Sequence, residues 1–324
     1  MLPNFSYVKA ASLKEAIRQL GTDQARVHAG GTDLLGCLHD HVFTAGKLVS
    51  ISGLEELRGI GPGAGGGLRI GALTTVTQVA EHSEIRRHYP LLAQSAQEVA
   101  SPQLRRQGTL GGNLCQKPRC WYYRGEFDCL RKGGPTCFAF AGENQYHCIL
   151  GGKDCYIVHP SDIAPALVAL DARVRIAGPG GPREVAVEDF HVPPAVDPQR
   201  ETALGPQEIL TEILLPPPRP GLRSAFRKVR ARRSWDFAVA GVALALQVDG
   251  DRVGQARVVL SGAAPVPWRA REAEAALTGR KLDAEAAKRA AEAALQGAAP
   301  LQHNGYKVAL FEGLIEEELR KIAG

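Results

Sequence analysis

The segment from residue 101 to residue 160 most constrains the fold of this chain, because it shows neither helical nor strand periodicity. Six of the seven cysteines lie within it, at positions 115, 120, 129, 137, 148 and 155. A stretch of that length without regular structure is usually functional. The periodic sequence on either side must therefore supply the hydrophobic core.

Composition excludes several classes of protein. With 324 residues and 44% hydrophobic residues, the chain is long and apolar enough to bury a core, which rules out general disorder. A net charge of +5, scattered along the chain, does not favour nucleic acid as a partner. The N-terminus lacks the apolar run of a secretory signal, and no run is long enough to span a membrane, so we expect a cytoplasmic protein. In that reducing compartment the clustered cysteines indicate metal binding rather than disulfides.

The periodic sequence predicts an α+β fold in two domains. Helices are expected at 12–20, 75–81, 90–99 and 162–170, and strands at 26–29, 47–51, 68–72 and 172–176. A Pro-rich linker at 216–221 separates residues 1–215 from residues 222–324. The second part is expected to contain a hairpin, 237–248 with 252–261, followed by helices at 269–295 and 306–322.

Two segments place paired glycines after an extended stretch, Ala29–Leu34 (AGGTDL) and Thr109–Leu114 (TLGGNL). Glycines allow backbone amides to approach a pyrophosphate, and neighbouring Thr or Asn side chains add donors. One such loop alone is more often a plain turn, but two of them favour a shared dinucleotide. Residues 61–66 also match GxGxxG, but a strand follows them instead of a helix, so we interpret them as a turn between strands.

The cysteine spacing leaves two metal sites open. Structural zinc sites usually contain a close pair of ligands, and only Cys115 with Cys120 approaches that spacing. A four-thiolate iron–sulfur cluster tolerates dispersed ligands, and the excess of Lys and Arg over Asp and Glu in residues 101–155 would stabilise its negative charge. On spacing alone the two are about equally favoured, and two of the six thiols are surplus. His28 and His159 are interpreted as structural residues, and no residue is assigned a catalytic role.

Five segments in order carry a resemblance to a known family. They are the two glycine motifs, Ser161–Leu167 (SDIAPAL), Glu208–Pro216 (EILTEILLP), and Ser224–Arg230 (SAFRKVR) with Asp236–Ala240 (DFAVA). Together they resemble the FAD-binding medium subunit of the xanthine dehydrogenase (molybdenum hydroxylase) family. The resemblance implies a two-part FAD-binding domain of the vanillyl-alcohol oxidase (PCMH) type. A C-terminal α+β domain like that of CO dehydrogenase flavoprotein would follow it.

The same resemblance implies the residues that bind FAD. Residues Val27–Leu34 would line the pyrophosphate, and those of the second motif would form another phosphate-side loop. Asp162 would bind the ribityl or ribose region, and Leu210 and Lys228 would lie beside the flavin ring. The full implied set is Val27, His28, Ala29, Gly30, Gly31, Thr32, Asp33, Leu34, Thr109, Gly111, Gly112, Asn113, Asp162, Leu210 and Lys228.

The long interval between Asn113 and Asp162 departs from ordinary members of that family. It resembles the β subunit of 4-hydroxybenzoyl-CoA reductase, in which an inserted loop holds an additional [4Fe-4S] cluster. The insert here would span about residues 115–158. Matching by order implies Cys120, Cys137, Cys148 and Cys155 as ligands, with Cys115 outside the set and Cys129 supernumerary.

The implied function is a relay of electrons. The family works with a small [2Fe-2S] subunit and a large molybdopterin subunit, as a dimer of heterotrimers. The extra cluster would admit electrons from a ferredoxin toward molybdenum, the direction that reductive dehydroxylation of an aromatic thioester requires. One alternative is the flavin subunit of a purine or N-heterocycle hydroxylase that passes electrons to NAD or another acceptor. A second alternative, of another class, is a non-enzymatic module with structural zinc.

Overall fold

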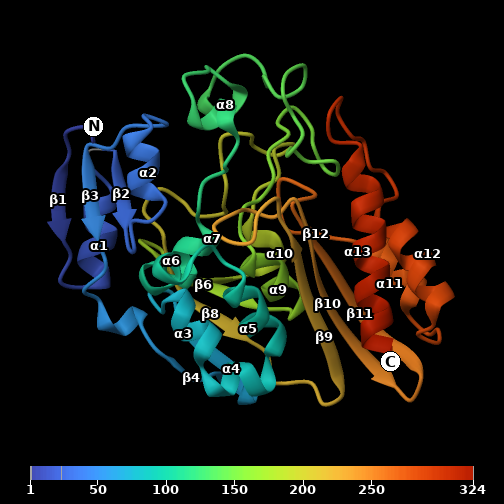
Figure 1. Ribbon diagram of the computed structural model, residues 1–324. Coiled ribbons are helices and arrows are strands. Elements are labelled where there is room, and N and C mark those ends of the chain that lie inside the picture. The colour runs from blue at the N-terminus through green and yellow to red at the C-terminus, as the bar shows by residue number, and fades with distance from the viewer. Residues whose placement is uncertain (1, 23, 324) are drawn as a thin grey trace.

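The computed structural model describes residues 2–22 and 24–323, and within them the strands form three β-sheets arranged in sequence across the molecule (Figure 1). The N-terminal sheet runs in the order β1-β3-β2, and its strands are parallel. Its strands and helices are β1 (Ser6–Lys9), α1 (Leu13–Leu20), β2 (Ala25–His28), α2 (Leu34–His39) and β3 (Lys47–Ser50). The Ser12 side chain caps α1 by accepting from the amide of Glu15, as expected for that sequence.

The central sheet is antiparallel and has the order β4-β5-β8-β6-β7. Its strands are β4 (Ile60–Pro62), β5 (Leu68–Gly71), β6 (Arg173–Gly178), β7 (Gly181–Ala186) and β8 (Ile209–Leu215). Side chains alternate across β6, so Val174 and Ile176 are buried while Arg175 pairs with Glu184 at 2.9 Å. The 3₁₀ turns η1 (Glu55–Leu57) and η2 (Ala64–Gly66) lie on either side of β4. Residues 61–66 thus run from β4 through a turn toward β5, which excludes a Rossmann site there.

The helices of this part pack on the central sheet and on one another. They are α3 (Val76–Glu81), α4 (Ser83–His88), α5 (Pro90–Gln97), α6 (Pro102–Gln107), α7 (Leu110–Leu114), α9 (Ile163–Ala169) and α10 (Val187–Phe190). Helices α6 and α7 correct the expectation that residues 101–160 lack regular structure throughout. Ser101 caps α6 through the amide of Leu104, and Pro102 occupies its first turn, so a local signal was present in a segment too short to show periodicity.

The C-terminal sheet has the order β12-β11-β10-β9 and carries helices on its outer face (Figure 1). Its elements are β9 (Leu222–Val229), β10 (Ala240–Asp249), β11 (Arg252–Ser261), β12 (Trp268–Arg269), α11 (Arg271–Leu277), α12 (Ala284–Ala294) and α13 (Tyr306–Ala323). Strand β10 sends Val242, Leu244 and Leu246 into the core shared with these helices, while Ala243 and Ala245 belong to the core of the preceding domain. The small alanines allow α5 and α9 to approach the sheet closely.

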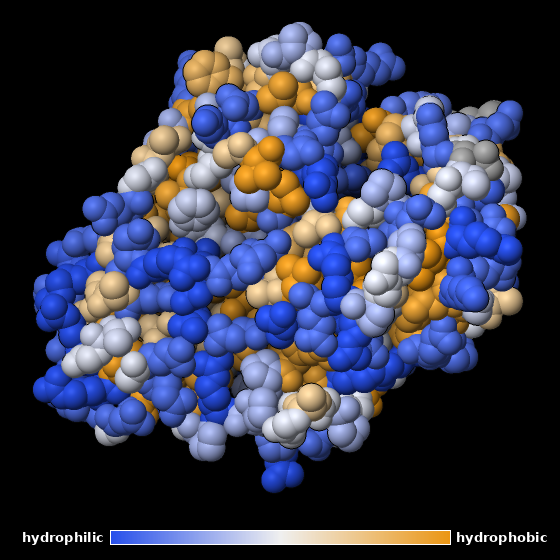
Figure 2. Space-filling view, turned by 180° about the vertical axis from the view of Figure 1, so that it is seen from behind, coloured by the Kyte–Doolittle hydropathy of each residue, from blue (hydrophilic) through white to orange (hydrophobic). Residues whose placement is uncertain are grey.

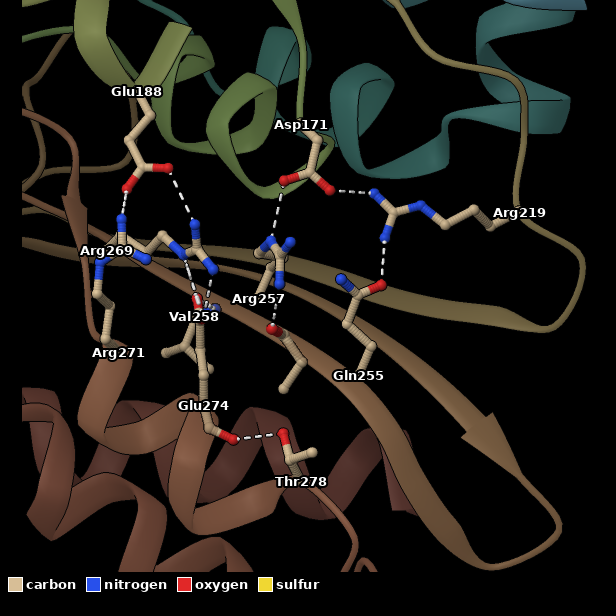
Figure 3. Close-up of polar contacts among 11 residues, drawn as sticks. Asp171, Glu188, Arg219, Gln255, Arg257, Val258, Arg269, Arg271, Glu274 and Thr278 are labelled. Atoms are coloured by element: carbon tan, nitrogen blue, oxygen red, sulfur yellow. Dashed lines mark hydrogen bonds and ion pairs between the residues drawn. The ribbon is translucent and has the colours of Figure 1, made fainter. Parts of the chain in front are cut away.

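Ion pairs reinforce this boundary between the domains (Figure 3). Asp171, which follows α9, pairs with Arg219 at 2.6 Å and with Arg257 of β11 at 2.9 Å. Glu188 of α10 pairs with Arg269 at 2.9 Å and also with Arg271. The two domains therefore meet through an apolar contact with ion pairs at its edge.

The insert 115–158 forms a separate lobe at the top of Figure 1, between the N-terminal sheet and α13. Its regular structure is limited to α8 (Trp121–Arg124) and the 3₁₀ turn η3 (Leu130–Lys132). Several aromatic side chains remain exposed on it, including Phe127, Phe140 and Tyr146, and Figure 2 shows hydrophobic residues among polar ones on the upper part of the surface. Within the described ranges, no helix combines the length and apolarity needed to cross a bilayer.

Candidate functional site

Two adjoining cavities run between the N-terminal sheet, the central sheet and the loop that joins β9 to β10. The first contains about 1200 Å³ of empty space and the second about 1160 Å³, in each case including the part that opens to solvent. Thr32, Asp33, Thr109, Gly112 and Gln116 line both. The two cavities share these residues and are together called the cleft below; concave sites of this kind hold cofactors and other small molecules.

The first glycine motif forms one wall of the cleft. Strand β2 ends at His28, and the chain turns through Gly30 and Gly31 before α2 begins at Leu34. A Cβ atom on Gly30 would collide with the backbone carbonyl of Gln107, and Gly31 has a φ of +73°. Both glycines are therefore required by the turn and by its contact with α6.

The second glycine motif forms the opposite wall. The Thr109 hydroxyl accepts from the amide of Gly112 at 3.1 Å and so begins α7. A Cβ atom on Gly111 would lie 2.8 Å from the Cβ of Ala72, so this glycine lets α7 pack against the central sheet. Asn113 accepts a 2.6 Å hydrogen bond from the Ser161 hydroxyl, which joins this loop to the start of α9.

Asp162 and Lys228 form a buried ion pair beside the cleft. The Lys228 ammonium donates to the Asp162 carboxylate at 2.7 Å and to the carbonyl of Glu98 at 3.1 Å. The side chains of the two partners are 5% and 1% exposed, so water screens the pair little. Burial raises the pKa of Asp162 to about 6, and the nearby Lys228 opposes that rise.

Most of the residues implied by the family resemblance line the cleft. Those in the first cavity are Val27, Ala29, Gly30, Gly31, Thr32, Asp33, Leu34, Thr109, Gly111, Gly112 and Leu210. Asn113 and Asp162 line the second. His28 does not line either cavity, and its ring packs edge-on against Tyr7 at 5.9 Å. Lys228 reaches the cleft only through Asp162.

Sequence reasoning did not identify several residues that also line the cleft. Phe43 lies under the guanidinium of Arg26, with 5.0 Å to the ring centroid, and Phe237 lies under that of Arg119 at 4.8 Å. Glu201 reaches the first cavity from a loop before β8. Phe43 and Glu201 lie outside every motif noted in the sequence. Phe237 lies within the Asp236–Ala240 segment, to which the resemblance assigned no contact with FAD.

A third, smaller cavity lies inside the insert and is lined by cysteines. Its lining includes four cysteines, Cys120, Cys129, Cys137 and Cys155. The aromatic residues Tyr122 and Phe138 also line it. Cys148 is buried but lies outside this lining, and Cys115 lines the first cavity of the cleft instead. The structure thus gathers four thiols in one place, with Cys129 where matching by order implies Cys148.

The arrangement of these thiols bears on which metal they suit. Among the described residues, no three His, Cys, Asp or Glu side chains stand close enough together to hold a single metal ion. Four thiolates around one zinc ion must converge to about 2.3 Å from a common centre. In a [4Fe-4S] cluster each thiolate binds a different iron, so the sulfurs lie on a larger tetrahedron. Four thiols lining one cavity supply the ligand type and number that a [4Fe-4S] cluster takes.

Several groups that line this cavity have strongly shifted pKa values. A hydrogen bond from the Cys155 thiol lowers the pKa of Cys137, whereas burial raises the pKa of Cys120 to about 11. The ring of His147 also lines the cavity, and burial together with the Lys307 ammonium lowers its pKa to about 4. The histidine is therefore neutral at physiological pH.

Charged residues of the insert tie it to the walls of the cleft. The Asp33 carboxylate accepts from Arg119 and from Arg124 at 2.8 Å each, and from the amide of Lys117 at 2.7 Å. Glu201 binds the Lys117 ammonium and also Arg131, the latter at 3.1 Å. The first glycine motif and the insert are therefore joined directly through one carboxylate.

Two protein families match the chain. Residues 3–218 match the family described as the FAD binding domain in molybdopterin dehydrogenase. Residues 224–322 match the CO dehydrogenase flavoprotein C-terminal domain.

Individual relatives agree with these matches. The chain is 40% identical to an aldehyde oxidoreductase FAD-binding subunit of Escherichia coli K12, over 78% of this chain and 79% of that protein. It is 32% identical to a xanthine dehydrogenase FAD-binding subunit of Escherichia coli O157:H7, over 91% and 86% of the two chains. Among solved structures, carbon monoxide dehydrogenase from Hydrogenophaga pseudoflava matches with a TM-score of 0.77 and 27% identity, over 98% and 96% of the two chains.

Proposed function

The chain belongs to the family of FAD-binding subunits of molybdopterin dehydrogenases, and on that premise we propose that it relays electrons through FAD and one [4Fe-4S] cluster. FAD, when bound, can exchange two electrons with one partner and single electrons with iron–sulfur clusters. The residues of this chain bind and orient the two groups. Substrate would be transformed on another subunit.

The cavity lined by Cys120, Cys129, Cys137 and Cys155 carries the cluster part of this proposal. We propose these four as the ligands, because they surround one space while Cys148 lies outside its lining. Arg131, which is 2% exposed at its side chain, lines the same cavity and adds positive charge. The covering aromatic side chains would limit contact of the cluster with water.

The cleft would hold FAD along its length. The glycine motifs lie on its two walls. The amides of Gly111 and Gly112 already donate to the Ala72 carbonyl and the Thr109 hydroxyl, so the first motif, Gly30 with Gly31, would offer its amides to a pyrophosphate. Asp162 and the Phe237 ring lie at the second cavity, where we place the ribityl chain and the isoalloxazine ring.

The absorbance spectrum and metal content of the protein isolated without oxygen test this proposal. We expect flavin bands with a broad iron–sulfur shoulder, together with about four iron and four acid-labile sulfide per chain. A colourless protein containing zinc would overturn the proposal in favour of a structural zinc module.

Two matched variants test the ligand set. Cys129→Ser should lose the iron and sulfide while FAD remains bound, because Cys129 does not line the cleft. Cys148→Ser should keep both, since Cys148 is not among the residues that line the cavity. The order-based set, Cys120, Cys137, Cys148 and Cys155, makes the reverse prediction for this pair of variants.

We propose that the chain assembles with a small [2Fe-2S] subunit and a large molybdopterin subunit as a dimer of heterotrimers. The names of its relatives, such as a carbon monoxide dehydrogenase medium chain, describe one chain among several. Exposed aromatic residues on the insert support a partner there, since side chains such as Phe140 at 62% exposure are favoured in interfaces. A ferredoxin is the proposed external carrier of single electrons.

The reaction of the whole complex has two candidate directions. The inserted cysteines support a relay like that of 4-hydroxybenzoyl-CoA reductase, in which electrons enter from ferredoxin and leave to substrate. The likeness to an aldehyde oxidoreductase subunit and to a xanthine dehydrogenase subunit favours the opposite direction, with electrons leaving an aldehyde, purine or N-heterocycle toward NAD or another acceptor.

Assaying the purified complex in both directions separates these candidates. Reduced ferredoxin with 4-hydroxybenzoyl-CoA tests the reductase. An aromatic aldehyde or xanthine with oxidised ferredoxin, or with NAD, tests the dehydrogenase. Failure of reduced ferredoxin to reduce the flavin would remove the reductase assignment.

A further inference from the structure

His147 lines the cysteine-lined cavity and also a neighbouring cavity formed with the loop that joins β9 to β10. It is only 3% exposed, and its Nε2 atom lies 3.2 Å from the sulfur of Cys120. Its ring packs edge-on against Trp121, with the centroids 5.4 Å apart, and tilted against Tyr122 at 6.2 Å. These two aromatic residues directly follow Cys120, so the histidine ring and the cysteine are fixed against the same short helix α8.

The C-terminal domain holds the backbone of His147 in place. The Lys307 ammonium donates to the His147 carbonyl at 3.0 Å, and the Asn304 amide donates to the same oxygen at 3.1 Å. Both side chains belong to residues that are 0% exposed. Lys307 also donates to the carbonyl of Gly262 at 2.5 Å, which anchors it to the end of β11. The position of the imidazole is therefore set by the start of α13 and not by the insert alone.

The hydrogen bond between His147 and Cys120 has a defined direction when Cys120 is a metal-bound thiolate. A thiolate sulfur has lone pairs but no proton, so it can only accept. The imidazole nitrogen that faces it, Nε2, must then carry the proton. The other ring nitrogen, Nδ1, is buried and makes no hydrogen bond within the described part of the chain.

We propose that His147 is a positioning residue that donates an N–H···S hydrogen bond to the Cys120 thiolate and thereby raises the reduction potential of the inserted cluster. This inference rests on the proposed function, because it requires the cluster. Reduction adds negative charge that is shared with the cysteine sulfurs, so a donor to one sulfur stabilises the reduced state more than the oxidised state. Its burial keeps water from replacing the donor.

Three variants measure this effect. His147→Phe removes the donor and keeps an aromatic ring against Trp121, His147→Gln retains an N–H group, and His303→Phe makes the same exchange at an exposed histidine. Iron, sulfide and flavin are quantified first, and the midpoint potential is then measured by a redox titration followed by EPR. We expect a more negative potential for His147→Phe, a value closer to wild type for His147→Gln, and no shift for His303→Phe.

A second measurement applies even if His147→Phe fails to assemble its cluster. In wild-type protein labelled with ¹⁵N-histidine, pulsed EPR of the reduced cluster should detect coupling to a histidine nitrogen and to a proton that exchanges in D₂O. Absence of both couplings would overturn the inference, as would an unchanged potential in a cluster-loaded His147→Phe protein. Wild-type protein without iron would instead contradict the proposed function.

Discussion

Backbone atoms shape the cleft, whereas charged side chains from distant parts of the chain hold the insert in place. At Gly30 and Gly111 the neighbouring atoms belong to Gln107 and Ala72, which sit on packed elements and cannot move aside. In the insert, the residues next to the cysteines are fixed by Asp33, Glu201 and Lys307. Substitutions in the cleft should therefore act through steric overlap. Substitutions around the insert should act through loss of ion-pair and hydrogen-bond partners.

The largest expected effect is at Gly111. Gly111→Val places atoms against Ala72 and Leu210, and overpacking of this kind costs about 1–3 kcal/mol of stability. Since the displaced α7 forms a wall of the cleft, most of the bound FAD should be lost. The ratio of flavin to protein absorbance measures this. Gly36→Ala is the control, since no atom lies within 4 Å of the added Cβ, and unchanged occupancy in Gly111→Val would contradict the packing argument.

The next effect is expected at the carboxylate that joins the two regions. Asp33→Ala leaves Arg119 and Arg124 without their shared partner, and charged hydrogen bonds of this kind contribute about 1.5–3 kcal/mol. We expect faster proteolysis and faster amide exchange within residues 117–131 and a lower iron content. Glu55→Ala removes an ion pair whose acid is 83% exposed and should leave both unchanged. Equal rates of proteolysis and amide exchange in the two variants would show that the structure of the insert does not depend on Asp33.

The third prediction concerns the pH dependence of stability that the buried pair of Asp162 and Lys228 should cause. The pKa of Asp162 is about 6 in the folded protein and about 3.9 in an unfolded chain. Between these values the folded state retains a proton that the unfolded state has released. The free energy of unfolding contributed by this group is therefore fully present below pH 3.9 and falls as pH rises to about 6. Urea unfolding of the wild type and of Asp162→Asn measures it, and equal slopes between pH 4 and 6 would contradict the assignment.

The smallest effect is expected at the domain boundary. Glu188→Gln weakens contacts to Arg269 and Arg271, but Arg269 keeps Glu274 at 2.8 Å, and the Arg271 side chain is 62% exposed. Partly exposed pairs contribute about 0–1 kcal/mol, so the melting temperature should change little. Glu285→Gln, which weakens an exposed ion pair within a helix, should also change the melting temperature little. A large loss of stability in Glu188→Gln alone would mean that charge, and not the apolar contact, holds the domains together.

Much of the fold followed from local patterns. Strand β5 and helices α1 and α3 lie within one or two residues of their predicted ranges, because alternation and helical spacing are properties of short segments. The region expected at 269–295 forms two helices, α11 and α12, since the break near Gly279 lies inside a segment whose composition favours helix throughout. The two glycine motifs were also recognisable from the sequence alone.

The amino-acid sequence by itself determined the succession of elements, the paired glycines and the presence of a cysteine-rich, basic insert. Only the tertiary structure decided which cysteines share a cavity, that Asp33 binds Arg119 and Arg124, and that His147 faces Cys120. The physical reason is distance along the chain. Periodicity reports contacts between residues a few positions apart, whereas the packing of separate elements brings together side chains such as those of Asp33 and Arg124, 91 positions apart.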